Sequence, residues 1–297
     1  MEKAVINALD YPCYPKGWQL DLMQGCDIGC IYCSLSDSEK IGPLDISDIL
    51  NSQAPPNSIY LSPNSDPFSE LAKENTHRIL EKFLPEGVGV SLITKKKIPK
   101  KTVELISKYP GSVLPNITLC RLDQELNSYI ERNAATTEER LDTIKELADA
   151  GMNVIVRMTP LFPVVDDSYE TLEKFISTIS QAGAFQAKVA YVVIRDALVF
   201  RPIINKIKKH PLLKQSWEVM TETIDVYKGK GNVPPVDRRV QLYRDVFGLT
   251  KKYGMNFGAC TVLDLPLLEM KEEDLGFPVC RKMLSNLQSK IDNHYHI

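Results

Sequence analysis

The chain has 297 residues, with 36 Lys and Arg against 38 Asp and Glu, a formal net charge of −2 and 43% hydrophobic residues. This length and composition allow at least one sizeable core, and 25% charged with 8% aromatic residues exclude a disordered tail protein. No apolar run approaches the roughly 18 residues of a membrane span, and the first residues lack a secretory h-region. We therefore expect a cytoplasmic protein without membrane contact. The near-neutral charge argues against nucleic acid as a partner.

Short apolar runs alternate with longer amphipathic ones over the first two thirds of the chain, which is typical of repeated βα units. The expected strands are Gln19–Met23, Ser58–Ser62, Val88–Thr94, Ile117–Leu122, Asn153–Met158 and Lys188–Ile194. The expected helices between them are Asp45–Asn51, Pro67–Phe83, Pro99–Lys108, Thr137–Ala150 and Ser168–Gln181. A capping box of Thr136 and Glu139 precedes the fourth of these helices, and Gly151 follows it as a stop signal.

Six strands joined by helices predict a parallel sheet, which at this length either stays open or curls toward a barrel. After residue 200 the βα rhythm gives way to polar helical stretches at Leu213–Lys228 and Asp237–Tyr253. A short apolar run, Met255–Ala259, then leads into Cys260. We expect an α/β protein in which residues 1–200 form the catalytic domain and residues 201–297 form a mostly helical C-terminal extension packed on it.

The loops that follow the carboxyl ends of parallel strands form the ligand face of such sheets. Cys26, Cys30 and Cys33 lie together in the first of these loops, within GCDIGCIYC, and they are three of seven cysteines. An odd number of cysteines in a chain expected to be cytoplasmic favours metal or redox chemistry over disulfides. Because the loop also carries two glycines, the three thiolates can converge on one metal centre.

Two metal centres fit this cysteine triplet. A structural zinc site needs a fourth Cys or His, and the nearest in sequence are Cys13 and His77. Three protein ligands instead suit a [4Fe–4S] cluster with one iron left open for another ligand. The spacing favours the open cluster, and a structural zinc site is the alternative.

The segment CDIGCIYC resembles the cluster motif of radical S-adenosylmethionine (SAM) enzymes. In that superfamily three cysteines hold a [4Fe–4S] cluster, and SAM chelates the open iron through its amino and carboxylate groups. Reductive cleavage of SAM then yields a 5′-deoxyadenosyl radical that abstracts hydrogen from the substrate. The resemblance implies a partial (β/α)6 barrel of parallel strands, with Tyr32 near the adenine. It also implies an external electron donor of the flavodoxin or ferredoxin type and a small-molecule or peptide substrate.

Within the superfamily, the chain resembles spore photoproduct lyase and its relatives. The resemblance rests on segments that occur in matching order: Ser62–Phe68, Ile93–Lys95, Ile117–Asp123, Ile130–Leu141 and Ala150–Pro163. It implies that Ser65 and Asp66 lie against the SAM amino group and that Lys95 meets the SAM carboxylate. Cys120 stands where relatives often have a serine near the ribose, and Pro63 stands where the lyase has a cysteine that returns hydrogen to the substrate radical. Proline cannot donate a hydrogen atom, so the chain is not expected to repair DNA by the route of the lyase.

Other readings of these residues stay open. Asp66 before a proline is also a common helix cap, and Lys95 stands in a run of three lysines that is typical of a solvated loop. Arg157 and Arg195 come at the carboxyl ends of apolar strands, and we expect both among the cofactor-binding residues.

The missing hydrogen donor leaves a role to fill, and Cys260 and Cys120 are the candidate catalytic thiols. Two alternative functions follow from these observations. One is a DNA lesion lyase that uses Cys260 or tyrosines for radical return, and the other is a non-catalytic zinc or cluster protein that scaffolds a partner.

Overall fold

The computed structural model describes residues 2–11, 14–33, 35, 38–55, 57–195, 201–221, 224–225, 231–259 and 273. At its centre is an eight-stranded sheet in the order β1-β2-β5-β6-β7-β8-β9-β13. The strands are β1 Ile6–Tyr11, β2 Tyr14–Leu20, β5 Ser58–Leu61, β6 Gly89–Thr94, β7 Val113–Thr118, β8 Ile155–Leu161, β9 Gln186–Tyr191 and β13 Asn256–Ala259. β1 pairs with β2 in antiparallel fashion, and every other pair of neighbours in this sheet is parallel.

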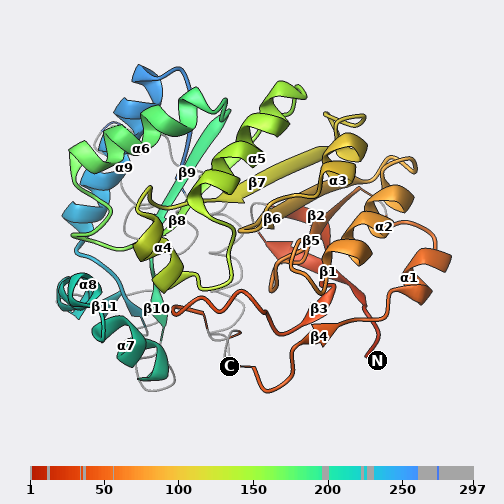
Figure 1. Cartoon of the computed structure of the whole chain (residues 1–297), viewed down its shortest axis with the longest axis horizontal. Helices are drawn as coiled ribbons and strands as arrows, with labels where there is room; N and C mark the ends of the chain where they lie inside the picture. The colour runs from red at the N-terminus through yellow and green to blue at the C-terminus, as the bar shows by residue number, and fades with distance from the viewer. Residues whose placement is uncertain are drawn as a thin grey trace.

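Helices connect the parallel strands and cover the outer face of the curved sheet, as Figure 1 shows for α2, α3, α5 and α6. The helices are α1 Ser47–Asn51, α2 Lys73–Phe83, α3 Lys100–Ile106, α4 Gln124–Ile130, α5 Thr137–Asp149, α6 Tyr169–Gln181, α7 Arg201–Lys208, α8 Pro211–Thr221 and α9 Val236–Lys252. The short strands β3 Met23–Gln24 and β4 Gly42–Pro43 form a two-stranded ribbon, and β10 Ile194–Arg195, β11 Ile224–Asp225 and β12 Gly231–Asn232 form a small third sheet. The fold is the partial α/β barrel that the sequence predicts.

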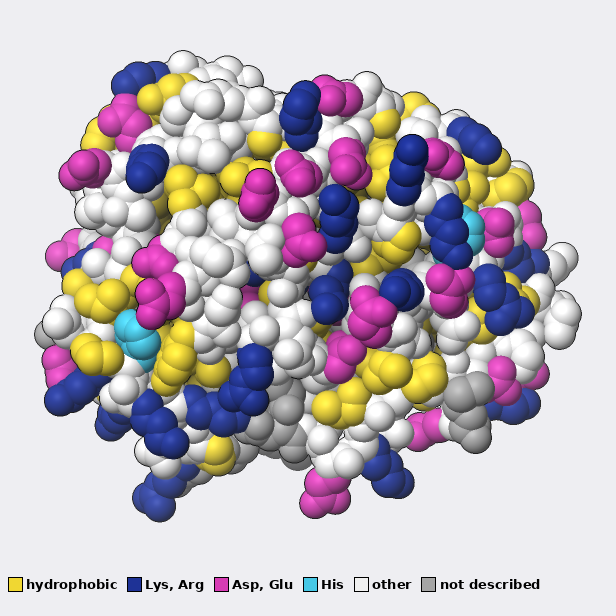
Figure 2. All heavy atoms as spheres, in the orientation of Figure 1, with side chains coloured by type: hydrophobic (Ala, Val, Ile, Leu, Met, Phe, Trp, Pro, Cys, Tyr) yellow, Lys and Arg dark blue, Asp and Glu magenta, His cyan; other side chains and the backbone are white. Residues whose placement is uncertain are grey.

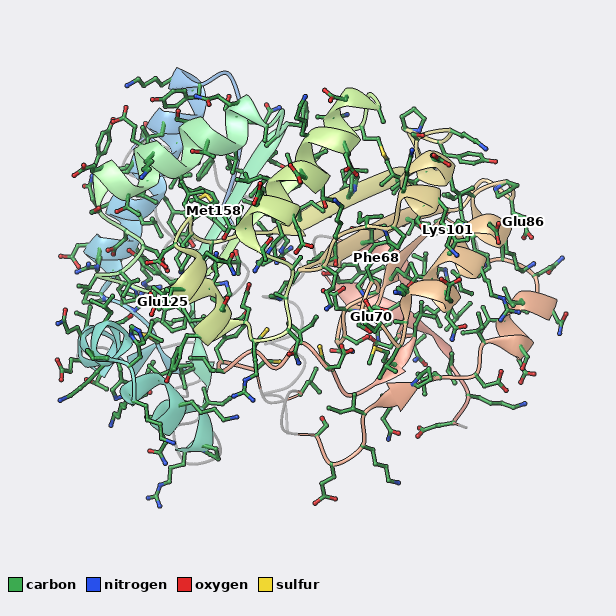
Figure 3. All side chains as sticks on the ribbon, in the orientation of Figure 1. Phe68, Glu70, Glu86, Lys101, Glu125 and Met158 are labelled. Atoms are coloured by element: carbon green, nitrogen blue, oxygen red, sulfur yellow. The ribbon has the colours of Figure 1, made fainter. Side chains whose placement is uncertain are left out.

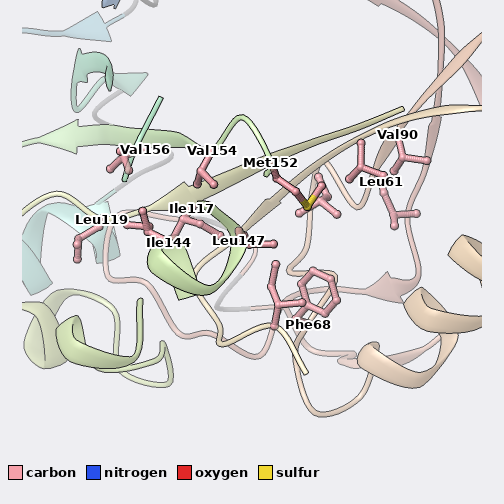
Figure 4. Packing of buried hydrophobic residues seen from close by; sticks show 14 of the residues in the cluster. Leu61, Phe68, Val90, Ile117, Leu119, Ile144, Leu147, Met152, Val154 and Val156 are labelled. Atoms are coloured by element: carbon pink, nitrogen blue, oxygen red, sulfur yellow. The ribbon is translucent and has the colours of Figure 1, made fainter. Parts of the chain in front are cut away.

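The main hydrophobic core lies between the sheet and its helices. Ile144 and Leu147 of α5 are fully buried there with Ile117 of β7 and Val156 of β8, and Figure 4 shows them side by side. Burial of each such side chain contributes roughly 1.5–3 kcal/mol. The capping box expected at the start of α5 is present, because Thr136 and Glu139 each accept from the backbone N–H of the other.

A second core fixes the cysteine loop to the helices that follow the sheet. Ile31, which lies between Cys30 and Cys33, packs in one cluster with Leu126 of α4 and with Ile203 and Ile207 of α7. Apolar contacts with α4 and α7 therefore hold the part of the loop between Cys30 and Cys33 in place.

The strand boundaries differ from the expected ones where proline and polar residues obscure the pattern. β7 begins at Val113 instead of Ile117 and continues through Pro115, which has no N–H for the ladder. The side-chain amide of Asn116 donates to Leu92 O at 3.2 Å, so a side chain supplies a cross-strand hydrogen bond next to the proline. β1 and the helices α4 and α7 are absent from the expected elements.

The C-terminal part of the chain contains α7, α8 and α9, and its apolar run at Met255–Ala259 also adds a strand to the central sheet. β13 pairs with β9 in parallel, from Asn256 opposite Gln186 to Ala259 opposite Val189. Residue 200 is therefore no boundary of the sheet. Of the expected helix Leu213–Lys228, residues up to Thr221 form α8, but Ile224–Asp225 form the strand β11, so the helix is shorter than expected. Residues 222–223 and 226–228 lie outside the described residues.

The surface over the helices carries interspersed charges of both signs, as Figure 2 shows. Figure 3 places Glu86 and Lys101 on the outer helical layer, whereas Phe68 and Met158 are 1% and 0% exposed. None of the helices in the described ranges has the length and apolar character needed to cross a membrane.

Candidate functional site

A cavity of about 480 Å³ lies at the carboxyl ends of the parallel strands. Its walls come from the cysteine loop after β2, the loop after β5 and the ends of β6, β7, β8 and β9. Helix α9 contributes two further lining residues, Arg239 and Tyr243. Loops at this edge of a parallel sheet are where ligands bind, so the cavity is the candidate site.

The cysteine loop brings Cys26, Cys30 and Cys33 to one side of this cavity. Cys30 is buried at 5% exposure, and the other two are half-buried. Gly25 has a φ of 67°, and a Cβ at that position would come within 2.7 Å of the Lys40 carbonyl oxygen. Only glycine fits this turn without a backbone shift, so the residue before Cys26 is set by the geometry of the loop.

The segment that follows α4 supports the cysteine loop by backbone hydrogen bonds. Ile31 N donates to Ile130 O at 2.9 Å, and Asn133 N donates to Ile28 O at 2.9 Å. Asn133 Nδ2 also donates to the carbonyl of Asp27 at 2.7 Å. The loop is thus held in its shape by a second chain segment more than 90 residues away in sequence.

A buried ion pair lies under this contact. Arg140 Nη1 donates to Glu131 Oε2 at 2.7 Å, and both side chains are 1% exposed. Tyr32 Oη donates to the other carboxylate oxygen of Glu131 at 2.8 Å. Burial opposes ionisation of Glu131, but Arg140 and Lys95 outweigh burial and lower the pKa of this carboxyl. Burial raises the pKa of the Tyr32 phenol well above its ordinary value. The Tyr32 phenol is therefore neutral, and the Glu131 carboxylate orients it.

Asp66 joins the loop after β5 to the end of β6. Its Oδ1 accepts from Thr94 Oγ1 at 2.7 Å and from Phe68 N at 2.9 Å, and its Oδ2 accepts from Lys95 N at 2.7 Å. The residue is 4% exposed, and burial raises the pKa of its carboxyl although these donors oppose the rise. It caps a turn here, not a helix, because α2 begins only at Lys73.

Lys95 is half-buried in the cavity wall, with Nζ 6.0 Å from the centre of the Tyr32 ring. Burial opposes its charge, but the acidic groups around it, led by Cys30 and Glu131, outweigh burial and raise its pKa. Lys95 is thus a fixed cation beside the cysteines. Ser65 Oγ, also at the cavity, lies 3.4 Å from Asp21 Oδ1.

The cavity brings together most of the residues singled out from the sequence. These lining residues are Cys26, Cys30, Tyr32, Cys33, Ser65, Asp66, Lys95 and Arg157. Cys120 is instead 5% exposed within the main core, and burial raises the pKa of its thiol to about 12. β7 ends at Thr118, and Thr118 lines the cavity where Cys120 does not.

Arg195 lies in β10. Its side chain lies outside the described part of the structure, so its expected place among the cofactor-binding residues stays a prediction. Cys260 lies outside the described residues.

Several lining residues carry no sequence signal. Arg239 and Tyr243 are one turn apart on α9, and both are buried, at 4% and 2% exposure. The Ser62 and Thr159 hydroxyls are buried at the cavity without a hydrogen-bond partner in the described part of the chain. Ser62 also has a φ of 50°, which is uncommon for a residue other than glycine. Only the position of Ser62 and Thr159 after strands could have suggested them.

A curved parallel sheet with three cysteines beside a cavity at its carboxyl edge defines a class of cofactor-binding enzymes, and comparisons with known proteins identify the family. A model of the Radical SAM superfamily matches residues 20–176, which is more than half of the chain. The chain belongs to the radical SAM superfamily of enzymes.

Curated relatives are distant. An uncharacterised protein of Acidianus two-tailed virus is 24% identical over 196 residues, which cover 57% of this chain and 65% of the relative. An uncharacterised protein of Mycobacterium tuberculosis (strain ATCC 25618 / H37Rv) is 24% identical over 201 residues, which cover 66% of this chain and 56% of the relative. The matches thus span less than two thirds of these relatives.

Solved structures share the fold. A spore photoproduct lyase mutant with bound AdoMet and dinucleoside spore photoproduct aligns with a TM-score of 0.64 and 13% identity, over 86% of this chain and 78% of the lyase. Streptococcus suis SuiB bound to S-adenosylmethionine aligns with a TM-score of 0.55 and 15% identity, over 90% of this chain and 56% of SuiB.

Proposed function

We propose that this chain is a radical SAM enzyme that holds a [4Fe–4S] cluster on Cys26, Cys30 and Cys33 and binds SAM in the adjoining cavity. The observation that carries the proposal is the presence of three cysteines and a fixed cation, Lys95, on one side of a single cavity. When bound, the cluster supplies one electron for reductive cleavage of SAM to methionine and a 5′-deoxyadenosyl radical, which abstracts hydrogen from the substrate.

The donor set fits a cluster better than a single ion. Within the described residues, no three Cys, His, Asp or Glu side chains converge as the ligands of one metal ion would. A single zinc ion holds its sulfurs at about 2.3 Å from one point. Three protein thiolates instead suit a [4Fe–4S] cluster with one iron left open, and Cys26, Cys30 and Cys33, which line one cavity, would hold it.

The chain's own residues suit the two ends of SAM. Lys95 is positioned to meet the carboxylate, since an ammonium group held beside a cavity favours a negative partner. Ser65 and the buried Ser62 hydroxyl lie on the loop after β5 and can bond the amino end. Asp66 has a positioning role in this proposal. Its carboxylate accepts from Lys95 N, so it fixes the spacing between the loop after β5 and Lys95.

The remaining walls hold the substrate and exclude water. Tyr191, Val192 and Val233 bring apolar surface to the cavity and are 3–5% exposed. A radical that attacks unactivated C–H bonds reacts with any hydrogen donor within reach, so a dry wall protects it from side reactions.

Anaerobic reconstitution with iron and sulfide tests the proposal. The wild-type chain is expected to turn brown, with the absorbance at about 400 nm that is typical of iron–sulfur proteins. In the presence of SAM and a strong reductant, it is expected to release 5′-deoxyadenosine. Cys30→Ala is expected to lose the cluster, whereas Cys120→Ala, which removes a buried thiol outside the cavity, is expected to keep it. A colourless wild type that binds zinc, or a cluster-bearing wild type that releases no 5′-deoxyadenosine, contradicts the proposal.

Repair of a DNA lesion is a weaker candidate. Pro63 lines the cavity where the resemblance to the lyase expects a hydrogen-donating cysteine. DNA binding that weakens steeply with salt would support this candidate, because contacts to phosphate release counterions. If the reconstituted enzyme shows no such DNA binding, repair of a DNA lesion is excluded as its function.

The proposed chemistry also needs an external one-electron donor, and the charge of one surface supports an acidic carrier protein of the flavodoxin or ferredoxin type. Residues 201–221, which form α7 and α8, contain five Lys or Arg and one carboxylate, Glu218. Figure 2 shows dark blue side chains gathered where Figure 1 draws these helices. The buried face of α7 packs in the same core as Ile31, next to the cysteines.

The double variant Arg201→Glu/Lys209→Glu tests this partner. It is expected to slow cluster reduction by reduced flavodoxin more than reduction by dithionite, since complementary charge mainly speeds encounter. Equal slowing with both reductants contradicts the surface as a docking site.

A further inference from the structure

The loop after β5 is anchored at both of its ends. At one end, Ser62 N donates to Leu20 O at 2.8 Å, which extends the pairing of β5 with β2 by one residue. At the other end, Asp66 Oδ2 accepts from Lys95 N at the end of β6. Residues 63–65 between these anchors line the cavity, so contacts with this short stretch set the shape of that wall.

Asp21, the residue after β2, binds this stretch through its side chain. Its Oδ1 accepts from Asn64 N at 3.0 Å, and its Oδ2 accepts from Asn64 Nδ2 at 2.8 Å. The Ser65 hydroxyl lies at a longer distance of 3.4 Å from Asp21 Oδ1. Both carboxylate oxygens therefore bind the same neighbour, and they fix the backbone and the side chain of Asn64 together.

The place of Asp21 in the chain makes it a rigid anchor. Leu20 and Leu22 on either side of it are 0% exposed, so the core holds the backbone at this point. Cys26 follows only five residues after Asp21. The carboxylate that holds Asn64 and the first cysteine of the motif therefore come from one short, anchored segment.

The orientation of the Asn64 amide decides which ligand group it can bind. Its Nδ2 faces the Asp21 carboxylate, because the reverse orientation would set the amide oxygen against a carboxylate. Its Oδ1 accepts no hydrogen bond from any of the described residues. Asn64 lines the cavity, so the atom that it leaves for a ligand is an acceptor, which suits N–H donors. Lys95, on β6, instead favours a carboxylate.

We infer that Asp21 is a positioning residue for SAM, which orients Asn64 so that Asn64 Oδ1 accepts from the SAM amino group. The inference rests on the proposed function and deepens it, because it assigns the direction in which SAM lies between the loop after β5 and Lys95. Asp21 does not line the cavity, and both of its carboxylate oxygens bind Asn64. It therefore acts through Asn64 and not as a ligand of SAM.

Asp21→Asn tests this role because it reverses the Asn64 amide and keeps the size of the side chain. An amide at position 21 can keep the bond to Asn64 N with its oxygen, but its NH2 group then faces the Asn64 side chain. Asn64 must turn over to accept there, and it leaves its own NH2 group for the ligand. Two N–H donors that face each other make no hydrogen bond, so we expect SAM to bind about tenfold more weakly.

Titration calorimetry with SAM on the anaerobically reconstituted enzyme measures this change. A reversed amide keeps the protein contacts of the loop, so iron content and unfolding in urea are expected to stay as in the wild type for Asp21→Asn. The rate of 5′-deoxyadenosine formation at saturating SAM is also expected to stay near that of the wild type, since the change acts on binding. Asp142→Asn, at an exposed position on α5, is the matched control and is expected to bind SAM as the wild type does.

Exchanging the two side chains provides a rescue. In Asp21→Asn/Asn64→Asp, the amide at position 21 donates to the carboxylate at position 64, whose second oxygen is again an acceptor for the ligand. We expect this double variant to recover most of the lost affinity for SAM. A role in stability alone predicts no such recovery.

Amide hydrogen exchange of the metal-free protein tests the contact without either cofactor. Asp21→Ala removes both hydrogen bonds, so exchange at Asn64 N is expected to become faster. Exchange at Lys95 N, which Asp66 binds, is expected to stay as in the wild type. Unchanged exchange at Asn64 N contradicts the contact on which the inference depends.

The outcomes separate the role of Asp21 from the proposed function. If the wild type cleaves SAM but Asp21→Asn binds SAM as tightly as the wild type, the role of Asp21 alone is overturned. A double variant that binds SAM no better than Asp21→Asn overturns it as well. A wild type without a cluster overturns the proposed function and the role of Asp21 with it. If Asp21→Asn fails to fold, Asn64→Ala at its exposed position decides, because it removes the acceptor and is expected to bind SAM about tenfold more weakly.

Discussion

Replacing Glu131 by glutamine removes the carboxylate of the buried pair beneath the cysteine loop. Arg140 would keep its bonds to Ala135 O and Thr118 O, both at 2.9 Å, but would lose the counter-charge of Glu131 at 2.7 Å. Removing one partner of a buried ion pair typically lowers the free energy of unfolding by about 3–5 kcal/mol. Glutamine still offers one acceptor oxygen, so we expect a loss near the lower end, about 3 kcal/mol. Against a total stability of about 5–15 kcal/mol, this change is large.

Urea unfolding of the metal-free protein measures this loss, and a second buried pair provides the control. Arg121 and Asp166 are 4% and 1% exposed with a closest distance of 2.8 Å, and Asp166 lies between β8 and α6 instead of in the segment that supports the cysteine loop. Asp166→Asn is expected to lower stability by a similar amount while the reconstituted enzyme keeps its iron. Glu131→Gln is expected to lose iron faster as well, because Glu131 belongs to the segment that supports the loop. An unfolding free energy within about 1 kcal/mol of wild type for Glu131→Gln would refute the reasoning.

Three further substitutions test the local structure around α5. In Gly183→Ala the new Cβ would lie 2.6 Å from the Ala148 Cβ at a φ of 88°, so we expect a loss of about 2–5 kcal/mol in chemical unfolding. Gly151→Ala has a similar φ of 79° but open space, so its loss should stay near 1–2 kcal/mol, and equal losses would show that crowding is not the cause. The N–H of Thr136 lowers the pKa of Glu139, so this cap stabilises α5 fully above the ordinary carboxyl value of 4.5 and less as the pH falls below it. Thermal melting should show Glu139→Gln to be less stable by about 0.5 kcal/mol at neutral pH and closer to wild type at about pH 3.5, and a pH-independent difference would contradict this sign.

The repeating part of the fold is predictable from the sequence because each βα unit buries its own apolar run. All six expected parallel strands exist, as does the capped helix α5. The elements without such a signal are not predictable in the same way. β1 lies at the sheet edge and has no continuous apolar run, and α4 has only seven residues and depends on the Asp123 cap. β7 is displaced because Pro115 reads as a strand breaker until Asn116 is seen to donate across the sheet.

The site divides along the same line. Spacing alone identifies the three cysteines, and position after a strand identifies Lys95. Cys120 was expected at the cavity from the resemblance, on a strand placed from Ile117 to Leu122. β7 instead ends at Thr118, which lines the cavity, while Cys120 lies in the main core. Arg239 and Tyr243 are beyond sequence reasoning, since an i, i+4 pair on the buried face of a helix is typical of core packing. They reach the cavity because the chain after residue 200 comes back to the sheet, where β13 pairs with β9.

The pairing of β13 with β9 also limits how far the chain can be shortened. A fragment ending at Arg195 would keep the whole family match and all three cysteines, yet it would strip β9 of its outer neighbour along four paired residues. Unpaired peptide groups on an exposed edge strand can pair with other chains, so we expect such a fragment to aggregate. The smallest fragment that keeps β9 paired on both sides therefore extends at least to Ala259.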